Sequence, residues 1–255
     1  MNGDSAKTVG DAVGWRSTPM QNVLAVLMSI AVAVFVISGT FCILLTPYPT
    51  HAFASMCVRD DISSASHDEL VEVADQTLAY CNADSDAELP LGDDYTISYT
   101  EDVMGHLDDV TVFFTGMKVL AVVSALAIVL LAACMVASAR KARGSGSVCK
   151  VSDVVGRLAS RSMLAGDAVV TALLLVIAAA AIVDFNSIFN LLHSLFFASG
   201  SWTFPSDSLL ICALPESFWM AMALLWASLL LIALVAILVA ALVIRSHTRG
   251  ALASR

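Results

Sequence analysis

Hydrophobic stretches with almost no charge alternate with polar segments along the chain. The four stretches run from Asn22 to Leu45, Val110 to Ala139, Ala168 to Val183 and Phe218 to Ile244. A membrane-spanning helix needs about 20 apolar residues. The third stretch is the shortest, so its helix is expected to continue past Asp184 toward His193. None of the stretches alternates like a strand, which predicts an all-α polytopic membrane protein with four transmembrane helices.

Lysine and arginine are concentrated on alternate connections between these stretches. The connection between the second and third stretches carries six of them: Arg140, Lys141, Arg143, Lys150, Arg157 and Arg161. The segment 46–109 has only Arg59, and the segment 186–217 has none. Segments rich in Lys and Arg stay on the cytoplasmic side. Both termini are therefore expected in the cytoplasm of a cell that holds this protein in its cell membrane.

The predicted organisation follows from these two patterns. It comprises a cytoplasmic tail (1–21), a first span (22–45), an extracytoplasmic subdomain (46–109), a second span (110–139), a basic cytoplasmic loop (140–167), a third span with an outer extension (168–195), an outer loop (196–216), a fourth span (217–244) and a cytoplasmic tail (245–255). The first hydrophobic stretch is longer than the core of a signal peptide, which favours an uncleaved span.

The segment between the first two spans is predicted to be an α-rich loop outside the membrane. Ser66 and Glu69 have the spacing of a capping box, which predicts a helix start. The alternation in 95–99 predicts a short strand or extended segment, and a helix that starts near Thr100 should run into the second span. Cys57 and Cys81 can either form a disulfide there or remain thiols, because connectivity cannot be deduced from sequence.

Composition excludes several functional classes. The chain is 58% hydrophobic, 14% charged and has a formal net charge of -9. Nucleic acid is not expected as a partner, because a basic stripe is missing. No phosphate-binding glycine loop or paired CxxC motif is present. A transporter would need polar residues near the middle of its spans, and only Lys118 interrupts them, near one end.

Two histidines are expected at the same membrane face. His106 precedes the second span, and Asp102, His106 and Asp109 share one helical face by their spacing. His193 follows the third span, on one face with Asn190. The pair can be simple interfacial anchors or a functional site. No metal site is expected, because zinc needs three or four ligands and these residues lack the usual close spacing.

Three motifs resemble a family of small bacterial integral membrane proteins that includes the lipoprotein intramolecular transacylases. They are HLDDV at 106–110, FNxxFNxxHxxFFxxGSW at 185–202 and FPxDSLLICALPESFW at 204–219. The last is the most specific, and the resemblance extends over most of the chain. The sequence departs from the family in having Leu192 before the second histidine and Val103 three residues before the first.

The resemblance implies an activity and a set of residues for it. Members move an acyl chain from the diacylglyceryl group of a lipoprotein's N-terminal cysteine to the amine of that cysteine. It implies His106 and His193 as the catalytic residues. From helical spacing, Asp102 and Asp109 are expected to support His106 and Asn190 to support His193, and Trp202 is expected to line the outer membrane interface. The implied partners are membrane lipids and diacylated lipoproteins, with no cofactor. The alternative is a non-catalytic membrane scaffold or accessory protein.

Overall fold

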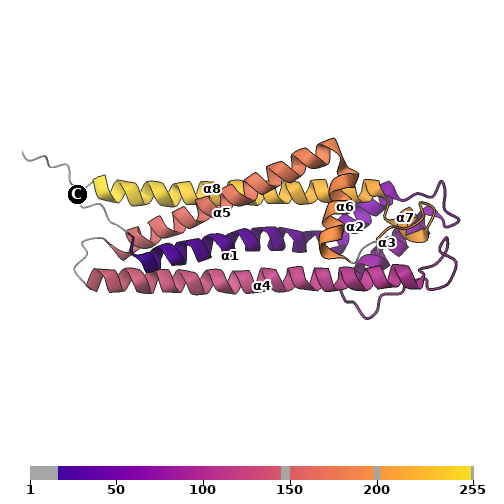
Figure 1. The fold of residues 1–255 in the computed structure, drawn as a ribbon, viewed down its shortest axis with the longest axis horizontal. Helices are drawn as coiled ribbons and strands as arrows, with labels where there is room; N and C mark the ends of the chain where they lie inside the picture. The colour runs from indigo at the N-terminus through magenta and orange to yellow at the C-terminus, as the bar shows by residue number, and fades with distance from the viewer. Residues whose placement is uncertain (1–16, 145–149, 198–201, 254–255) are drawn as a thin grey trace, which may run out of the picture.

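The computed structural model describes residues 17–144, 150–197 and 202–253, and this part of the chain is helical without a named strand (Figure 1). The helices are α1 (Pro19–Leu44), α2 (Pro47–Cys57), α3 (His67–Cys81), α4 (Glu101–Gly144), α5 (Val151–Val183), α6 (Phe185–Phe196), α7 (Leu209–Ala213) and α8 (Glu216–Ala253). By length and composition α1, α4, α5 and α8 can cross a membrane. The predicted all-α fold with four such helices is confirmed. Most of the expected tail 1–21 lies outside the described residues.

Helix α1 begins three residues before its hydrophobic stretch because its first turn is capped. The Thr18 hydroxyl accepts a hydrogen bond from the Gln21 backbone N–H, and the Gln21 side chain accepts one from the Thr18 N–H. Pro19 occupies the first helical position, where a missing N–H costs nothing. The start at Pro19 is thus determined by polar residues that a hydropathy pattern does not weigh.

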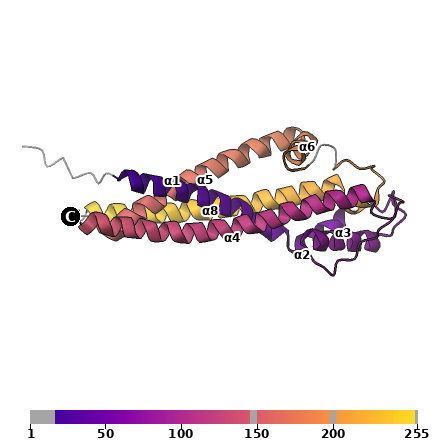
Figure 2. The same ribbon diagram turned by 60° about the horizontal axis from the view of Figure 1, so that its bottom comes forward.

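The other three long helices, α4, α5 and α8, all contact α1. Close approach of α1 and α5 depends on Gly166, where an added Cβ would lie 2.7 Å from the Ser29 carbonyl oxygen. Small residues serve this purpose at many membrane helix crossings. The Trp226 indole N–H of α8 donates to the Thr40 hydroxyl of α1, at 3.1 Å. Beyond these contacts α5 leaves the bundle toward its C-terminal end (Figures 1 and 2).

The third spanning helix differs from the sequence prediction at both ends. It begins at Val151, inside the segment expected to be a basic loop, and therefore gains its length at that end. The predicted continuation past Asp184 is wrong. Asp184 is extended, at φ -154° and ψ 94°, and its carboxylate accepts a hydrogen bond from the Ser187 N–H. This N-cap starts α6, a separate helix that turns back across the end of the bundle (Figure 1).

The end of the bundle opposite the termini carries an end subdomain, formed by α2, α3, α7 and the loops that join them (Figures 1 and 2). The capping box that starts α3 is confirmed, with the Ser66 hydroxyl and the Glu69 carboxylate bonded to each other's backbone N–H. Helix α2 was not predicted, because Pro47 and Pro49 suggest a loop, yet Pro47 occupies its first turn. This subdomain has its own buried core, which includes Leu70, Ala74, Tyr99, Leu209 and Cys212.

Tyr99 anchors the loop between α3 and α4 to this core. The expected strand at 95–99 is absent, since these residues form turns and an isolated bridge joins Leu91 to Tyr99. The Tyr99 side chain is buried, and its hydroxyl lies 2.8 Å from the Thr77 hydroxyl of α3. Cys57 and Cys81 are free thiols, so no disulfide contributes to the subdomain. The start of α4 is therefore held by side-chain packing and hydrogen bonds.

Candidate active site

His106 lies in the second turn of α4, directly after the segment that Tyr99 anchors. Its neighbours Val103 and Leu107 on the same helix pack into the core of the end subdomain. The His106 side chain is buried, and its Nδ1 atom has no hydrogen-bond partner. Buried polar groups are normally paired. Nδ1 of His106 thus lacks the partner that a buried polar group normally has.

His193 lies near the end of α6, and its tautomer is determined by its own helix. Its Nδ1 atom is 2.8 Å from the Phe189 carbonyl oxygen, which can only accept a hydrogen bond. Nδ1 must therefore carry the proton, and Nε2 of the neutral ring keeps its lone pair. Burial lowers the pKa of His193, and the bond to the Phe189 carbonyl opposes that shift. His193 is consequently a neutral base at neutral pH.

The fold brings the two histidines together although 87 residues separate them in the chain. Their ring centroids are 6.2 Å apart and the ring planes differ by 29°. Two rings at this separation are close enough for one small substrate to contact both of them. Phe197 flanks both rings, at 5.1 Å from His106 and 5.3 Å from His193 between centroids. The pair therefore forms an aromatic-walled site for one reacting group.

The residues expected to support the histidines are placed less uniformly. Trp202 and Asn190 are joined by a 3.1 Å hydrogen bond from the indole N–H to the amide oxygen, and the Trp202 ring lies 5.9 Å from that of His193. Asp109 interacts with His106 through its charge alone. Asp102 is exposed and forms no hydrogen bond with His106. The predicted shared face of α4 is present, but the carboxylates do not hold the imidazole.

Two contacts of the site were missed by sequence reasoning. The Phe189 ring is 3.9 Å from the His193 ring between centroids, and the Phe204 ring is 5.8 Å from that of His106. The i, i+4 spacing of Phe189 and His193 on α6 was the available signal. The contact of Phe204 depends on the path of the loop before α7, which no local pattern specifies.

A cavity of about 820 Å³ opens beside His106, between the start of α4 and the loop before α7. Its lining residues are Tyr95, Thr100, Glu101, Asp102, Val103, Gly105, His106, Asp109, Thr203, Phe204, Pro205 and Ser208. This is the volume of a small-molecule binding site. The cavity gives His106 a polar surrounding on one part of its surface, in contrast to the aromatic rings around His193.

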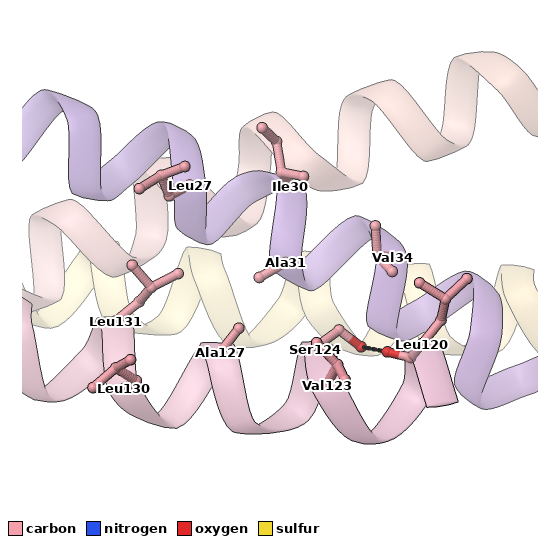
Figure 3. Close-up of a pocket in the computed structure, with 10 residues that line it drawn as sticks. All are labelled: Leu27, Ile30, Ala31, Val34, Leu120, Val123, Ser124, Ala127, Leu130 and Leu131. Atoms are coloured by element: carbon pink, nitrogen blue, oxygen red, sulfur yellow. Dashed lines mark hydrogen bonds between the residues drawn. The ribbon is translucent and has the colours of Figure 1, made fainter. Parts of the chain in front are cut away.

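A second cavity, of about 390 Å³, is an open groove between α1 and α4, and exposed side chains such as Leu27 and Leu130 line it (Figure 3). Aliphatic side chains line it, and its one hydroxyl, that of Ser124, donates to the Leu120 carbonyl oxygen of its own helix. None of the side chains that line this cavity is a histidine, a carboxylate or another acid–base group. Among the described residues no group of three or more His, Cys, Asp or Glu side chains is placed to hold a metal ion.

Comparison with known proteins places these observations in a family. The family described as lipoprotein intramolecular transacylase Lit matches residues 23–219, which include both histidines and all four long helices in whole or in part. The chain belongs to the Lit family. It is thus a multi-pass integral membrane protein, as its four spanning helices also indicate.

Two solved structures share the fold of this Lit family member. One is the membrane-integral lipoprotein intramolecular transacylase Lit from Bacillus cereus, at 15% identity and a TM-score of 0.63, over 92% of this chain and 96% of that one. The other is a histidine-to-arginine variant of the same protein, at 14% identity and a TM-score of 0.64, over 91% and 95% of the two chains. No curated protein sequence matches the chain.

Proposed function

We propose that this protein moves one acyl chain within a diacylated lipoprotein, from an ester of the N-terminal diacylglyceryl cysteine to the α-amine of that cysteine. Membership of the Lit family supports the reaction class. The observation that carries the proposal to particular residues is the pair of buried imidazoles, His106 and His193, 6.2 Å apart between ring centroids. Two imidazoles this close can both act on one substrate, and each of them can accept or donate a proton.

His193 is the base in this proposal. Its Nε2 lone pair accepts a proton from the α-amine while the amine nitrogen attacks the ester carbonyl carbon. The resulting imidazolium is stabilised by the hydrogen bond from Nδ1–H to the Phe189 carbonyl oxygen, a bond that favours the charged ring. The amine thereby becomes a nucleophile without a metal ion or an activated cofactor.

His106 serves the other end of the reaction. A protonated ring nitrogen of His106 donates to the ester oxygen as the carbon–oxygen bond breaks, and the glycerol oxygen leaves as a hydroxyl. The products are an amide on the cysteine and a free hydroxyl on the glyceryl group. The proton that His193 took from the amine then passes to His106. This transfer returns both histidines to their starting protonation states.

The site is placed at the extracytoplasmic membrane face in this proposal. The basic residues at the end of α4 and at the start of α5 support a cytoplasmic location for that end of the bundle, together with both termini. The end subdomain and α6 then lie outside. Helix α6 has an apolar side that includes Leu191, Leu195 and Phe196, all exposed, and such a helix suits the boundary between lipid and water. Membrane lipids and diacylated lipoproteins are the partners at this boundary.

Substitution of the histidines tests the assignment. His106→Ala and His193→Ala should each abolish formation of the N-acylated lipoprotein in cells that lack any other N-acylating enzyme, and the double variant should be no worse than either single one. The measurement is the fraction of lipoprotein N-terminal peptides with a free α-amine. Unchanged N-acylation in both single variants, at normal protein level in the membrane, would support the non-catalytic alternative.

A further inference from the structure

The cavity beside His106 has features that acid–base chemistry at the histidine pair does not use. Three carboxylate side chains line it, those of Glu101, Asp102 and Asp109, and none of its lining residues is a lysine or arginine. Glu101 and Asp102 are exposed at the start of α4 and make no side-chain hydrogen bond or ion pair with another described residue. Their negative charges are thus free to meet a positively charged ligand.

His106 is a second feature of this cavity, separate from the carboxylates, that indicates a ligand. Its side chain is only 9% exposed, it lines the cavity, and its Nδ1 atom has no partner. The same ring contacts Phe197 and His193, which belong to the aromatic part of the site. His106 is therefore shared by an apolar, aromatic region and by an acidic, polar cavity.

A diacylated lipoprotein has the same two-part character around its N-terminal cysteine. The acyl chains on the sulfur side need an apolar surrounding, whereas the polypeptide continues from the cysteine carbonyl into water. We propose that the acidic cavity receives the polypeptide segment that follows the lipidated cysteine, and that its carboxylates select segments carrying lysine or arginine. This inference rests on the proposed function, because it takes a lipidated N-terminus as the substrate.

The negative charge of the cavity favours a basic polypeptide segment over an anionic lipid headgroup. An anionic phosphate headgroup would be repelled by carboxylates and would find no lysine or arginine in the lining. A segment with two or more positive charges gains one exposed ion pair for each carboxylate it reaches, and each such pair changes affinity by about two- to fivefold. Two pairs give a preference of about four- to twenty-five-fold for a basic over a neutral segment. This preference should shrink at about 1 M salt, where exposed charges are screened.

The test uses two synthetic lipopeptides with the same diacylglyceryl cysteine, one followed by Ser and four lysines, the other by Ser and four glutamates. Binding is measured by fluorescence anisotropy on the full chain carrying His193→Ala, reconstituted in phosphatidylcholine nanodiscs so that no turnover occurs. We expect the lysine lipopeptide to bind more tightly. Adding Glu101→Gln with Asp102→Asn should remove most of that preference.

A matched pair of substitutions controls for net charge. Glu88→Gln with Asp93→Asn neutralises the same two residue types at exposed positions of the same segment, outside the cavity lining, and should leave the preference intact. Equal affinities for the two lipopeptides, or equal loss of the preference in both double variants, would overturn the inference. The inference would also be overturned if added phosphatidylethanolamine lowered the affinity for the lysine lipopeptide as much as the cavity substitutions do. The site would then hold a lipid headgroup.

Turnover measured separately on the protein with His193 intact keeps the two proposals distinct. If the lysine preference depends on the cavity carboxylates while no acyl transfer occurs, the peptide-binding cavity stands and the transacylase proposal falls. If acyl transfer occurs at the same efficiency on both lipopeptides, the transacylase proposal stands and the selective cavity is overturned.

Discussion

Replacement of Gly166 by alanine should disturb both the stability of the bundle and the histidine pair at its end. The added Cβ would lie 2.7 Å from the Ser29 carbonyl oxygen of α1, about 0.7 Å inside the 3.4 Å at which ordinary contact begins. A backbone carbonyl in a helix cannot rotate away, so α5 must shift relative to α1. Overpacking of this kind costs about 1–3 kcal/mol of unfolding free energy.

The same shift reaches the active site because α5 carries α6 and His193. About 27 Å of continuous helix separates Gly166 from Asp184, at about 1.5 Å per residue. A displacement of about 1 Å at reacting groups can reduce a rate by up to about a hundredfold. We therefore expect Gly166→Ala to lower the acyl-transfer rate severalfold or more, measured on purified protein with a diacylated lipopeptide, alongside its thermal unfolding.

Gly116→Ala is the matched control on α4. No atom lies within 4 Å of the Cβ position there, and alanine favours a helix over glycine by up to about 1 kcal/mol. Its stability should be equal to or above that of the parent protein, and its rate unchanged. If Gly166→Ala is as stable and as active as Gly116→Ala, the close approach of α1 and α5 does not position His193, and the reasoning is refuted.

Three further outcomes follow from the structure. The imidazole of His193 should titrate below the ordinary histidine pKa of about 6.5, because burial keeps this base neutral to lower pH; a His193 pKa at or above that value, read from its ring resonances by NMR across a pH series, contradicts this. Trp202→Phe removes the indole N–H bond to Asn190 but keeps a ring beside His193, so it should cost at most about tenfold in rate, less than Trp202→Ala under the same assay. Cys57 should react with a maleimide in the folded protein and buried Cys81 only after unfolding, with no change in unfolding temperature on adding reductant; a protein that needs reduction before either thiol reacts contains the disulfide after all.

Much of the fold could be predicted because hydrophobic length and capping are local properties. The four spanning helices and the Ser66 capping box each depend on residues within one or two turns. The break at Asp184 was also encoded locally, since Asp184 and Ser187 have the spacing of an N-cap. It was missed because the apolar pattern resumes directly after it. A hydropathy pattern does not distinguish one long helix from two helices joined at a capping residue.

The candidate site was predictable only in part, for a different reason. Sequence placed His106 and His193 at the same end of the bundle, but their 6.2 Å separation depends on α6 turning back across that end. The expected support of His106 by Asp102 followed from helical spacing. In the structure neither Asp102 nor Asp109 forms a hydrogen bond with the His106 ring. Pairs that join distant segments, such as His51 and Asp75 at 2.7 Å, have no local signal at all.

The position of the acyl chain on a defined lipopeptide tests the central claim most directly. Intramolecular transfer leaves the mass of a diacylated lipopeptide unchanged, so the product must be identified by its fragments in tandem mass spectrometry. With purified protein in a lipid bilayer, the account predicts fragments with one acyl chain on the cysteine amine and one on the glyceryl group. It also predicts no such fragments with His193→Ala. A product whose amine remains free, or one that has gained the mass of a second lipid's acyl chain, would contradict the account.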